Sequence, residues 1–380
     1  MSDINQPPAG EAGQQPDVLA PMEPRSPHRP EAAAPLPPPP PVRRKSGWKK
    51  VLLVLVLVGG VGLVLLFIIA SVLSAMVGLA GGGELVPSVY RSGKGDQVVA
   101  VLEVNGMIDG GKAALVDRFR RVVEKDKNVK AILLRVDSPG GVVAPCDEIY
   151  HMLKGLQAGT GSPEGRGKKL VVSMGSTAAS GGYYISAPAD AIYAEPTTVT
   201  GSIGVIGSVF VVKGTMEKIG VDVKIVRSTQ AKDWKAAPNA FEEPTPAQMA
   251  ELQKTIDLLH ERFQGIVQAE RGRKIKTVTR PREGVDAEGK PLTDVDPYNG
   301  KIYLADAAKD IGLIDGIGYF DDAVDAAARL AGLSKPKVVI YRVHRSPLAE
   351  LGRLETPAIS PKLLEEIQVP KLMMVWKVGG

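Results

Sequence analysis

The feature that most restricts the fold of this chain is a run of 33 residues without charge, at positions 51–83. Residues 51–73 are mainly Val, Leu and Ile, and as a helix they would measure about 34 Å, enough to cross a hydrocarbon layer of about 30 Å. A cleaved signal peptide is the alternative, but 50 residues precede the run and its apolar length exceeds that of a signal peptide. We therefore expect a single transmembrane helix over residues 51–73.

The charges on either side of this run predict its orientation. The basic flank 43–50 contains five Lys and Arg residues, whereas residues 84–98 contain two basic and two acidic residues. Because an excess of positive charge stays in the cytoplasm, the N-terminus is expected inside and everything after the span outside.

The segments around the span have little predicted structure. Residues 1–42 contain 13 of the 30 prolines, a composition typical of a disordered tail with polyproline II character. This cytoplasmic tail is a spacer or a docking site for a proline-binding domain. Residues 74–95 are expected to form a linker, and the C-terminal tail 344–380 has no assignment.

Charge and the scarce metal ligands exclude several classes of function. Of the net charge of +5, residues 1–50 contribute +2 and the other 330 residues only +3, which argues against a nucleic-acid partner. Cys146 is the only cysteine, so neither an intrachain disulfide nor a zinc site built from thiolates can form. The four histidines form no metal-binding motif, which disfavours a metallohydrolase and a Ser-His-Asp triad.

Residues 96–343 are predicted to form one α/β domain. β-Branched runs and helix-length segments alternate, which favours βαβ units with a mostly parallel sheet. The strands are expected at 97–104, 131–136, 170–174, 191–194 and 223–226, the helices at 113–126, 147–156 and 246–271, and a surface loop at 281–297. The apolar stripe of helix 246–271 indicates core packing or a subunit contact.

Three segments contain residues suited to catalysis. DSPGG at 137–141 follows a predicted strand, and its glycines could present backbone N–H groups to an anion or serve an ordinary turn. GSTAASGGYY at 175–184 surrounds Ser180 with small residues, so that Ser180 is a nucleophile or simply a helix N-cap. STQAKDW at 228–234 contains Lys232, and a lysine in a loop is usually a solvated charge.

A lysine can replace histidine as the base of a serine hydrolase. Its amine has an unperturbed pKa near about 10.4 and is therefore protonated at neutral pH. Removal of water disfavours the ammonium and lowers the pKa by up to about 3–5 units. A neutral lysine could then take the proton of a serine and return it to the leaving amine.

The order of these segments resembles the signal peptide peptidase A family, the S49 Ser/Lys proteases. The resemblance covers about residues 96–333 and is carried by DSPGG at 137–141, ASGGYY from Ala179, TGSIGVIG at 200–207, the pair Lys232 and Asp233, GLIDGIG at 312–318 and FDDA at 320–323. It implies a crotonase/ClpP-like α/β fold and a ring-shaped homo-oligomer, such as an octamer. The chain departs from the family in having NGK at 299–301 where the family usually has DGR, and in its longer loop 281–297.

The resemblance also implies a role for individual residues. Ser180 would be the nucleophile and Lys232 the general base, from the same chain or a neighbouring one. The N–H groups of Gly141 and Ser180 would stabilise the oxyanion, and Ser202 would orient the lysine amine. No metal and no other cofactor is implied.

These inferences predict a serine endopeptidase held at the outer face of the bacterial cytoplasmic membrane. Its expected substrates are hydrophobic peptides such as cleaved signal peptides, and its expected partners are those peptides, the lipid bilayer and other copies of the chain. Two alternatives remain open, a crotonase-type enzyme acting on acyl-CoA and a non-catalytic membrane scaffold. The first needs an acidic base near the oxyanion site, and the second would be expected to lack Ser180 or Lys232.

Overall fold

The computed structural model describes residues 85–162, 164–285, 289–343 and 371–375, together with scattered residues between 48 and 69. The chain divides into two units, residues 1–69 and 70–380. The predicted tail 1–42 and most of the predicted span 51–73 lie outside the described residues. Of the helices that the structure describes, none is both long enough and apolar enough to span a membrane.

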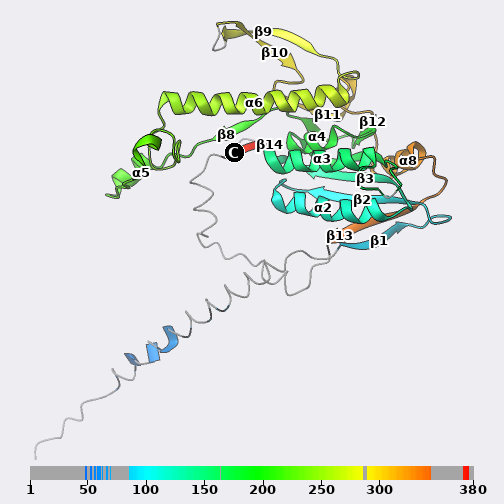
Figure 1. The fold of residues 1–380 in the computed structure, drawn as a ribbon, viewed down its shortest axis with the longest axis horizontal. Helices are drawn as coiled ribbons and strands as arrows, with labels where there is room; N and C mark the ends of the chain where they lie inside the picture. The colour runs from blue at the N-terminus through cyan, green and yellow to red at the C-terminus, as the bar shows by residue number, and fades with distance from the viewer. Residues whose placement is uncertain are drawn as a thin grey trace, which may run out of the picture. The chain divides into compact units, whose positions relative to one another are not determined.

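A mostly parallel sheet forms the centre of the second unit, as the sequence predicts (Figure 1). Its strands lie in the order β1-β13-β2-β3-β5-β6-β12, and β7 joins β5 to β11. The pairs from β13 to β12 and the β5–β7 pair are parallel, whereas β1–β13 and β7–β11 are antiparallel. The strands are β1 (Leu85–Arg91), β2 (Val98–Asn105), β3 (Val129–Ser138), β5 (Lys169–Ala179), β6 (Ala191–Ala194), β7 (Val199–Gly201), β11 (Ile302–Leu304), β12 (Gly316–Ile317) and β13 (Lys337–Val343).

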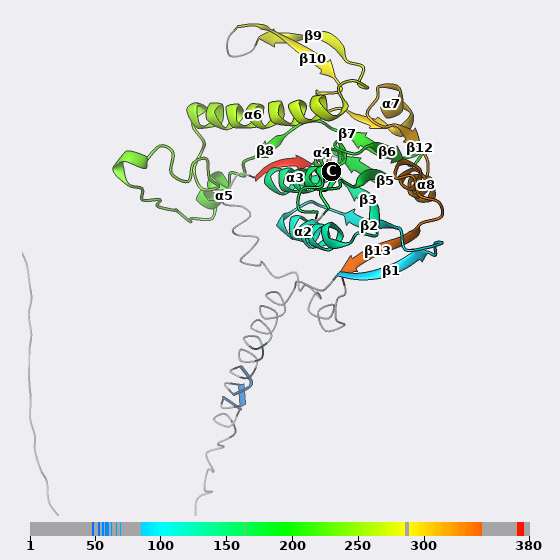
Figure 2. The ribbon, with the colours of Figure 1, turned by 45° about the vertical axis from the view of Figure 1, so that its right-hand side comes forward.

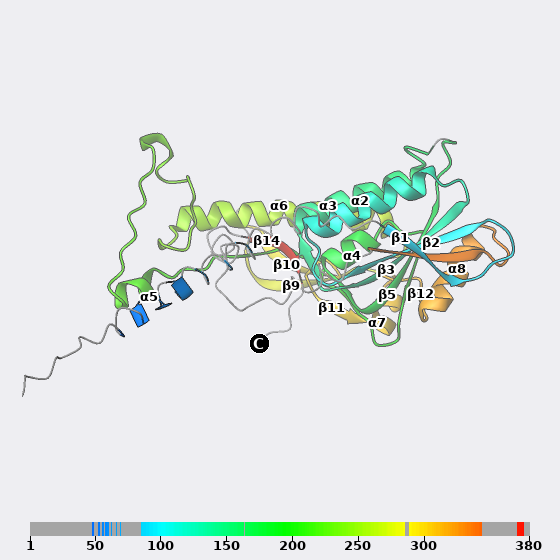
Figure 3. The ribbon, with the colours of Figure 1, turned by 90° about the horizontal axis from the view of Figure 1, so that it is seen from below.

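Helices cover both faces of this sheet because alternate strand residues point to opposite sides. Along β2, Ala100 and Leu102 belong to the larger buried cluster, whereas Val99 and Val101 belong to the smaller one. The larger cluster contains residues of α2 (Gly110–Lys125), α3 (Val143–Ala158) and α4 (Gly181–Ser186), and the smaller contains residues of α8 (Phe320–Leu330). Figure 3 shows α2 and α3 on one side of the strands and α8 on the other.

Helix α6 (Pro246–Arg271) matches the predicted bounds and begins at a capping box, in which Thr245 and Gln248 satisfy each other's backbone N–H groups. Only its C-terminal half is packed on the core, through Phe263 and Val267. Its N-terminal half extends beyond the sheet (Figure 1), and Leu258 is 57% exposed. The apolar stripe therefore serves core packing along only part of its length.

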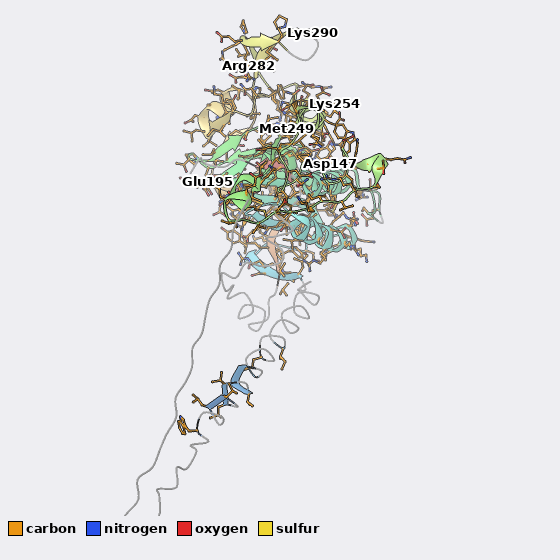
Figure 4. All side chains as sticks on the ribbon, turned by 90° about the vertical axis from the view of Figure 1, so that its left-hand side faces the viewer. Asp147, Glu195, Met249, Lys254, Arg282 and Lys290 are labelled. Atoms are coloured by element: carbon orange, nitrogen blue, oxygen red, sulfur yellow. The ribbon has the colours of Figure 1, made fainter. Side chains whose placement is uncertain are left out.

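Two predicted segments are wrong. Residues 223–226, expected as a strand, pair with no other strand, and Val226 is 93% exposed. Residues 281–297, expected as a loop, contribute to a hairpin of β9 (Val278–Val285) and β10 (Pro291–Asp296). Arg282 and Lys290 lie on this hairpin, which projects away from the main sheet (Figure 4). In both cases a partner strand decided the outcome, and β-propensity by itself does not supply one.

Chain segments outside the predicted domain also form strands. Residues 85–91, predicted within the linker, form β1 on the edge of the main sheet. In the C-terminal tail, which has no assignment from sequence, Lys371–Val375 forms β14. This strand pairs with β4 (Gly140–Val142) and β8 (Ile206–Ser208) in a separate small sheet.

Asp315, within the GLIDGIG segment, joins α6 to the end of the sheet. Its carboxylate accepts hydrogen bonds from Arg271 and Lys274 at 2.8 and 2.6 Å, and from the backbone N–H of Ile192 at 2.8 Å. The Arg271 side chain is 1% exposed. Burial acts to raise the pKa of Asp315, but the hydrogen bonds from Arg271 and Lys274 outweigh it and hold the pKa below its ordinary value.

We expect Asp315→Ala to lower the free energy of unfolding by about 3–5 kcal/mol, because it leaves the Arg271 guanidinium buried without its carboxylate. Asp310→Ala, at an exposed aspartate near the same segment, is the matched control.

The stability that Asp315 provides should also depend on pH. Because the pKa of Asp315 is lowered in the folded chain, this stabilisation is present above the unfolded pKa of about 3.9 and is lost as the pH falls below it. Urea titrations at pH 7 and pH 3 measure both effects, and equal losses for the two variants would contradict this role.

Candidate active site

Ser180 lies on a sharp turn between β5 and α4. Its backbone has φ 53° and ψ −115°, a left-handed conformation that is strained for a residue other than glycine. Such a turn between a strand and a helix is the usual support of a nucleophilic serine, because it holds the hydroxyl at the end of the sheet. The hydroxyl of Ser180 donates to the carbonyl of Gly204 at 3.4 Å, and the residue is 1% exposed.

The glycines after Ser180 allow the DSPGG turn to lie directly against it. A Cβ on Gly181 would be 2.6 Å from the Cys146 Sγ and 3.0 Å from the backbone nitrogen of Gly141. A Cβ on Gly182 would be 2.8 Å from the carbonyl oxygen of Ser138. These small residues therefore accommodate a second turn of the same chain.

Gly141 presents its N–H group to the side of the turn that faces away from Ile108. Ile108 pairs with Gly141 by donating to the Gly140 carbonyl and accepting from the Val142 N–H, both at 2.9 Å. Because successive N–H groups of a strand point in opposite directions, the N–H of Gly141 points away from Ile108. The Gly141 N–H is therefore not used in the pairing with Ile108, and its role as an oxyanion donor stays a prediction.

The second predicted oxyanion donor is corrected by the structure. The Ser180 N–H donates to the carbonyl of Gly201 at 2.8 Å, because the turn directs it back toward β7, and it is therefore not available to a substrate. Gly181, the next residue, has its nitrogen 2.8 Å from the place where a Cβ on Gly140 would lie. The backbone nitrogens of Gly141 and Gly181 therefore both lie where the two turns touch, and the residue after the nucleophile is a usual oxyanion donor on such turns.

Ser202 follows this arrangement directly along the chain. It is 8% exposed, has a left-handed φ of 51°, and its N–H donates to the carbonyl of Lys301 at 2.8 Å. Lys301 belongs to the NGK segment, one of the departures from the family pattern, so this departure lies against the predicted lysine-orienting residue. A Cβ on Gly201, which has φ +84°, would be 2.8 Å from the Tyr303 ring, so only glycine fits there.

Lys232 has no contact with the Ser180 hydroxyl in the described chain. It ends the 3₁₀ helix η1 (Thr229–Ala231) on a segment that extends with α5 (Lys213–Lys218) beyond the sheet (Figure 1). The residue is exposed, and the hydrogen bond given by the Ser180 hydroxyl goes to Gly204. The fold of one chain therefore places the predicted nucleophile in the interior. The predicted base lies on the connection between β8 and α6, residues 209–245, which is called the arm below.

Other reactive side chains near the turn have structural contacts. Cys146 is buried, and burial, with a smaller contribution from Asp147, raises the pKa of its thiol to about 12. The Asp137 carboxylate accepts hydrogen bonds from the Ser176 hydroxyl and the Thr177 N–H at 2.9 and 3.0 Å. It holds the end of β5 and does not supply the free acidic base that a crotonase-type reaction requires. In the described ranges, no three His, Cys, Asp or Glu side chains are grouped so as to hold a metal ion.

A charged cavity of about 260 Å³ lies elsewhere, at the amino ends of the strands. Its lining includes Gln97, Val129 and Lys168, which precede or begin β2, β3 and β5. Ser180 follows the carboxyl end of β5, so this cavity is at the opposite end of that strand from the site.

Comparisons with known proteins show the family of this chain. The family described as "Peptidase family S49" matches residues 164–334. A relative from Enterococcus faecium bears the name "Putative signal peptide peptidase SppA". It is 31% identical over 277 residues, which are 69% of this chain and 72% of the relative. The chain belongs to peptidase family S49. It is a serine-type peptidase by this membership, and the S49 segments include the Ser180 turn.

Other similarities are partial. Protease 4 of Salmonella typhi is 34% identical over 267 residues, which are 70% of this chain but only 38% of that protein. This S49 chain therefore spans less than half the length of that relative. A ClpP1 variant from Listeria monocytogenes aligns with 60% of this chain and 95% of its own, with 15% sequence identity and a TM-score of 0.34.

We expect Gly181→Ala to lower kcat about 10²–10³-fold, because the added methyl group separates the N–H groups of Gly141 and Gly181 that would stabilise the oxyanion. Gly155→Ala is the matched control, since a Cβ there meets no atom within 4 Å, and in helix α3 it should stabilise the chain by about 0.5–1 kcal/mol. Steady-state hydrolysis of casein and thermal unfolding measure the two effects. Full activity of the Gly181 variant would exclude the Gly141–Gly181 pair as the oxyanion site.

Proposed function

We propose that this S49 peptidase is a membrane-anchored serine endopeptidase that uses Ser180 and Lys232 to hydrolyse hydrophobic peptides such as cleaved signal peptides. The observation that carries the proposal is the strained turn at Ser180, which lies against the DSPGG turn at the backbone nitrogens of Gly141 and Gly181. Such N–H groups stabilise the negative charge that develops on the carbonyl oxygen during attack.

In the proposed reaction, the Ser180 hydroxyl attacks the scissile carbonyl and the Lys232 amine takes its proton. The lysine then protonates the leaving amine, and water hydrolyses the acyl-enzyme in a second step. Ser202 orients the lysine amine. A lysine can act as a base only after water is removed from it, so the exposed arm that carries Lys232 has to be covered in the active assembly.

We propose that a ring-shaped homo-oligomer, such as an octamer, provides this cover and brings Lys232 of one chain to Ser180 of a neighbour. The arm bears exposed apolar side chains, among them Phe210 at 64%, Ile219 at 70% and Trp234 at 54% exposure. Exposed apolar surface of this kind is typical of a protein interface. The exposed N-terminal half of α6 lies beside the arm (Figure 1) and extends the same surface.

The dyad is tested with Ser180→Ala and Lys232→Met, each of which should lower peptidase activity by more than about 10³-fold. Lys235→Met, at a second exposed lysine on the arm, is the control and should retain activity. If the lysine acts between chains, rings assembled from equal amounts of the two inactive variants should recover about a quarter of the activity, because that fraction of sites has both residues. Full activity of either single variant would refute the dyad.

Membrane anchoring is proposed from the uncharged run 51–83 and its basic flank, with the peptidase domain at the outer face of the bacterial cytoplasmic membrane. Proteinase K added to intact spheroplasts should then digest residues 96–343, and a tag placed within residues 1–42 should become accessible only after lysis. The opposite pattern would contradict the topology while leaving the peptidase chemistry unaffected.

A further inference from the structure

The helix that follows Ser180 has little stability of its own. Helix α4 has six residues, begins with two glycines, and receives no side-chain hydrogen bond from Ser180 at its N-terminus. Glycine is unfavourable in helices, and so short a helix is not stable by itself in water. The strained backbone of Ser180 persists only where the surrounding structure fixes it. The position of Ser180 therefore depends on the contacts that hold α4 to the rest of the chain.

One carboxylate joins α4 to the two helices beside it. Helices α3, α4 and α6 lie next to one another (Figure 2). Tyr184 of α4 is 1% exposed, and its hydroxyl donates to the carboxylate of Asp147 on α3 at 2.6 Å. The guanidinium of Arg262 on α6 donates to both oxygens of the same carboxylate, at 2.7 and 2.9 Å. The Tyr184 ring also packs against Phe263 of α6, with 4.8 Å between the ring centroids.

The bond between Tyr184 and Asp147 is of a strong kind. Burial, together with the hydrogen bond to Asp147, raises the pKa of the Tyr184 hydroxyl above its ordinary value. The hydroxyl therefore stays protonated and remains the donor. A hydrogen bond from a hydroxyl to a carboxylate is short and about twice as strong as one between neutral groups, so this contact fixes the distance between α3 and α4.

The same bond lies close to both turns of the candidate site. Asp147 is six positions after Gly141, on the helix that begins directly after β4. Tyr184 is four positions after Ser180. A shift of α4 relative to α3 would therefore move the Ser180 hydroxyl relative to the Gly141 N–H. A displacement of about 1 Å at a reacting group can lower a rate about 10²-fold.

We propose that Asp147 is a positioning residue of this peptidase, acting through Tyr184 to hold the Ser180 hydroxyl at its working distance from the Gly141 N–H. This inference rests on the proposed function, in which Ser180 attacks the scissile carbonyl and Gly141 helps to stabilise the oxyanion. Tyr184 is buried and its hydroxyl is bonded to Asp147, so neither residue needs to contact the peptide. Loss of their bond should therefore slow the chemical step without weakening substrate binding.

The first experiment compares two tyrosines that donate to carboxylates, in the full chain in detergent micelles. Tyr184→Phe removes the hydroxyl and keeps the ring, and it should lower kcat for casein about 10–10²-fold with KM unchanged. Tyr150→Phe is the matched control, because the Tyr150 hydroxyl donates to Glu270 at 2.7 Å and joins α3 to α6 without involving α4. It should keep the native kcat, although thermal unfolding should show similar losses of stability in both variants.

The second experiment separates positioning from a general loss of structure. Asp147→Asn retains an oxygen that accepts from Tyr184 and should keep kcat within about threefold of the native value. Asp147→Leu has no acceptor and should lose as much kcat as Tyr184→Phe. The double variant Asp147→Leu with Tyr184→Phe should be no slower than either single variant, because both changes break the same bond. Light scattering should give the same assembly mass for every variant.

The outcomes separate this proposal from the proposed function. A native kcat in Tyr184→Phe, an equal loss of kcat in Tyr150→Phe, or additive losses in the double variant would overturn the positioning role. A loss that appears only as a higher KM, or only with a smaller assembly, would also overturn it. In each case the proposed function stands as long as Ser180→Ala is inactive. If Ser180→Ala is as active as the native chain, the proposed function itself fails.

Discussion

The site depends on the close approach of two backbone turns at the carboxyl ends of β3 and β5. The DSPGG turn follows β3, the turn at Ser180 follows β5, and these strands are parallel neighbours. Their turns can touch only because Gly181 and Gly182 have no side chains, since a Cβ on either would lie within 3.0 Å of the DSPGG turn or Cys146. Parallel neighbouring strands bring their carboxyl ends to one edge of a sheet, where α/β proteins form their sites. Packing of backbone against backbone thus positions both the proposed nucleophile, Ser180, and the backbone nitrogens beside it.

A site built in this way recognises the peptide main chain. In the proposed site, Gly141 and Gly181 would contribute N–H groups, and β4 and β8 would contribute strand edges, none of which depends on the side chains of a bound peptide. Main-chain recognition suits an enzyme that acts on peptides of varied sequence, and it also makes the cleft accessible to any extended segment of its own chain.

Much of the architecture could be predicted from sequence because it depends on local patterns. The parallel strands, the helix 246–271 and the turn at Ser180 all follow from short runs of residues whose periodicity or composition is distinctive. The failures involve partners that are remote in the chain. Residues 223–226 have strand composition but no neighbouring edge, residues 278–285 include proline and glycine but find a partner in β10, and residues 371–375 pair with motifs more than 160 positions earlier.

The sequence by itself determined the chemical parts of this protein: one serine among small residues, two glycine turns, a lysine on a polar segment and an uncharged run long enough for a bilayer. Only the tertiary structure decided which backbone groups face the cleft. It showed that the Ser180 N–H is bonded to Gly201, that Gly181 lies beside Gly141 instead, and that Lys232 is on an exposed arm. The direction of an N–H group depends on φ and ψ at a turn, and those angles are set by contacts between distant segments, which no local pattern of residues contains.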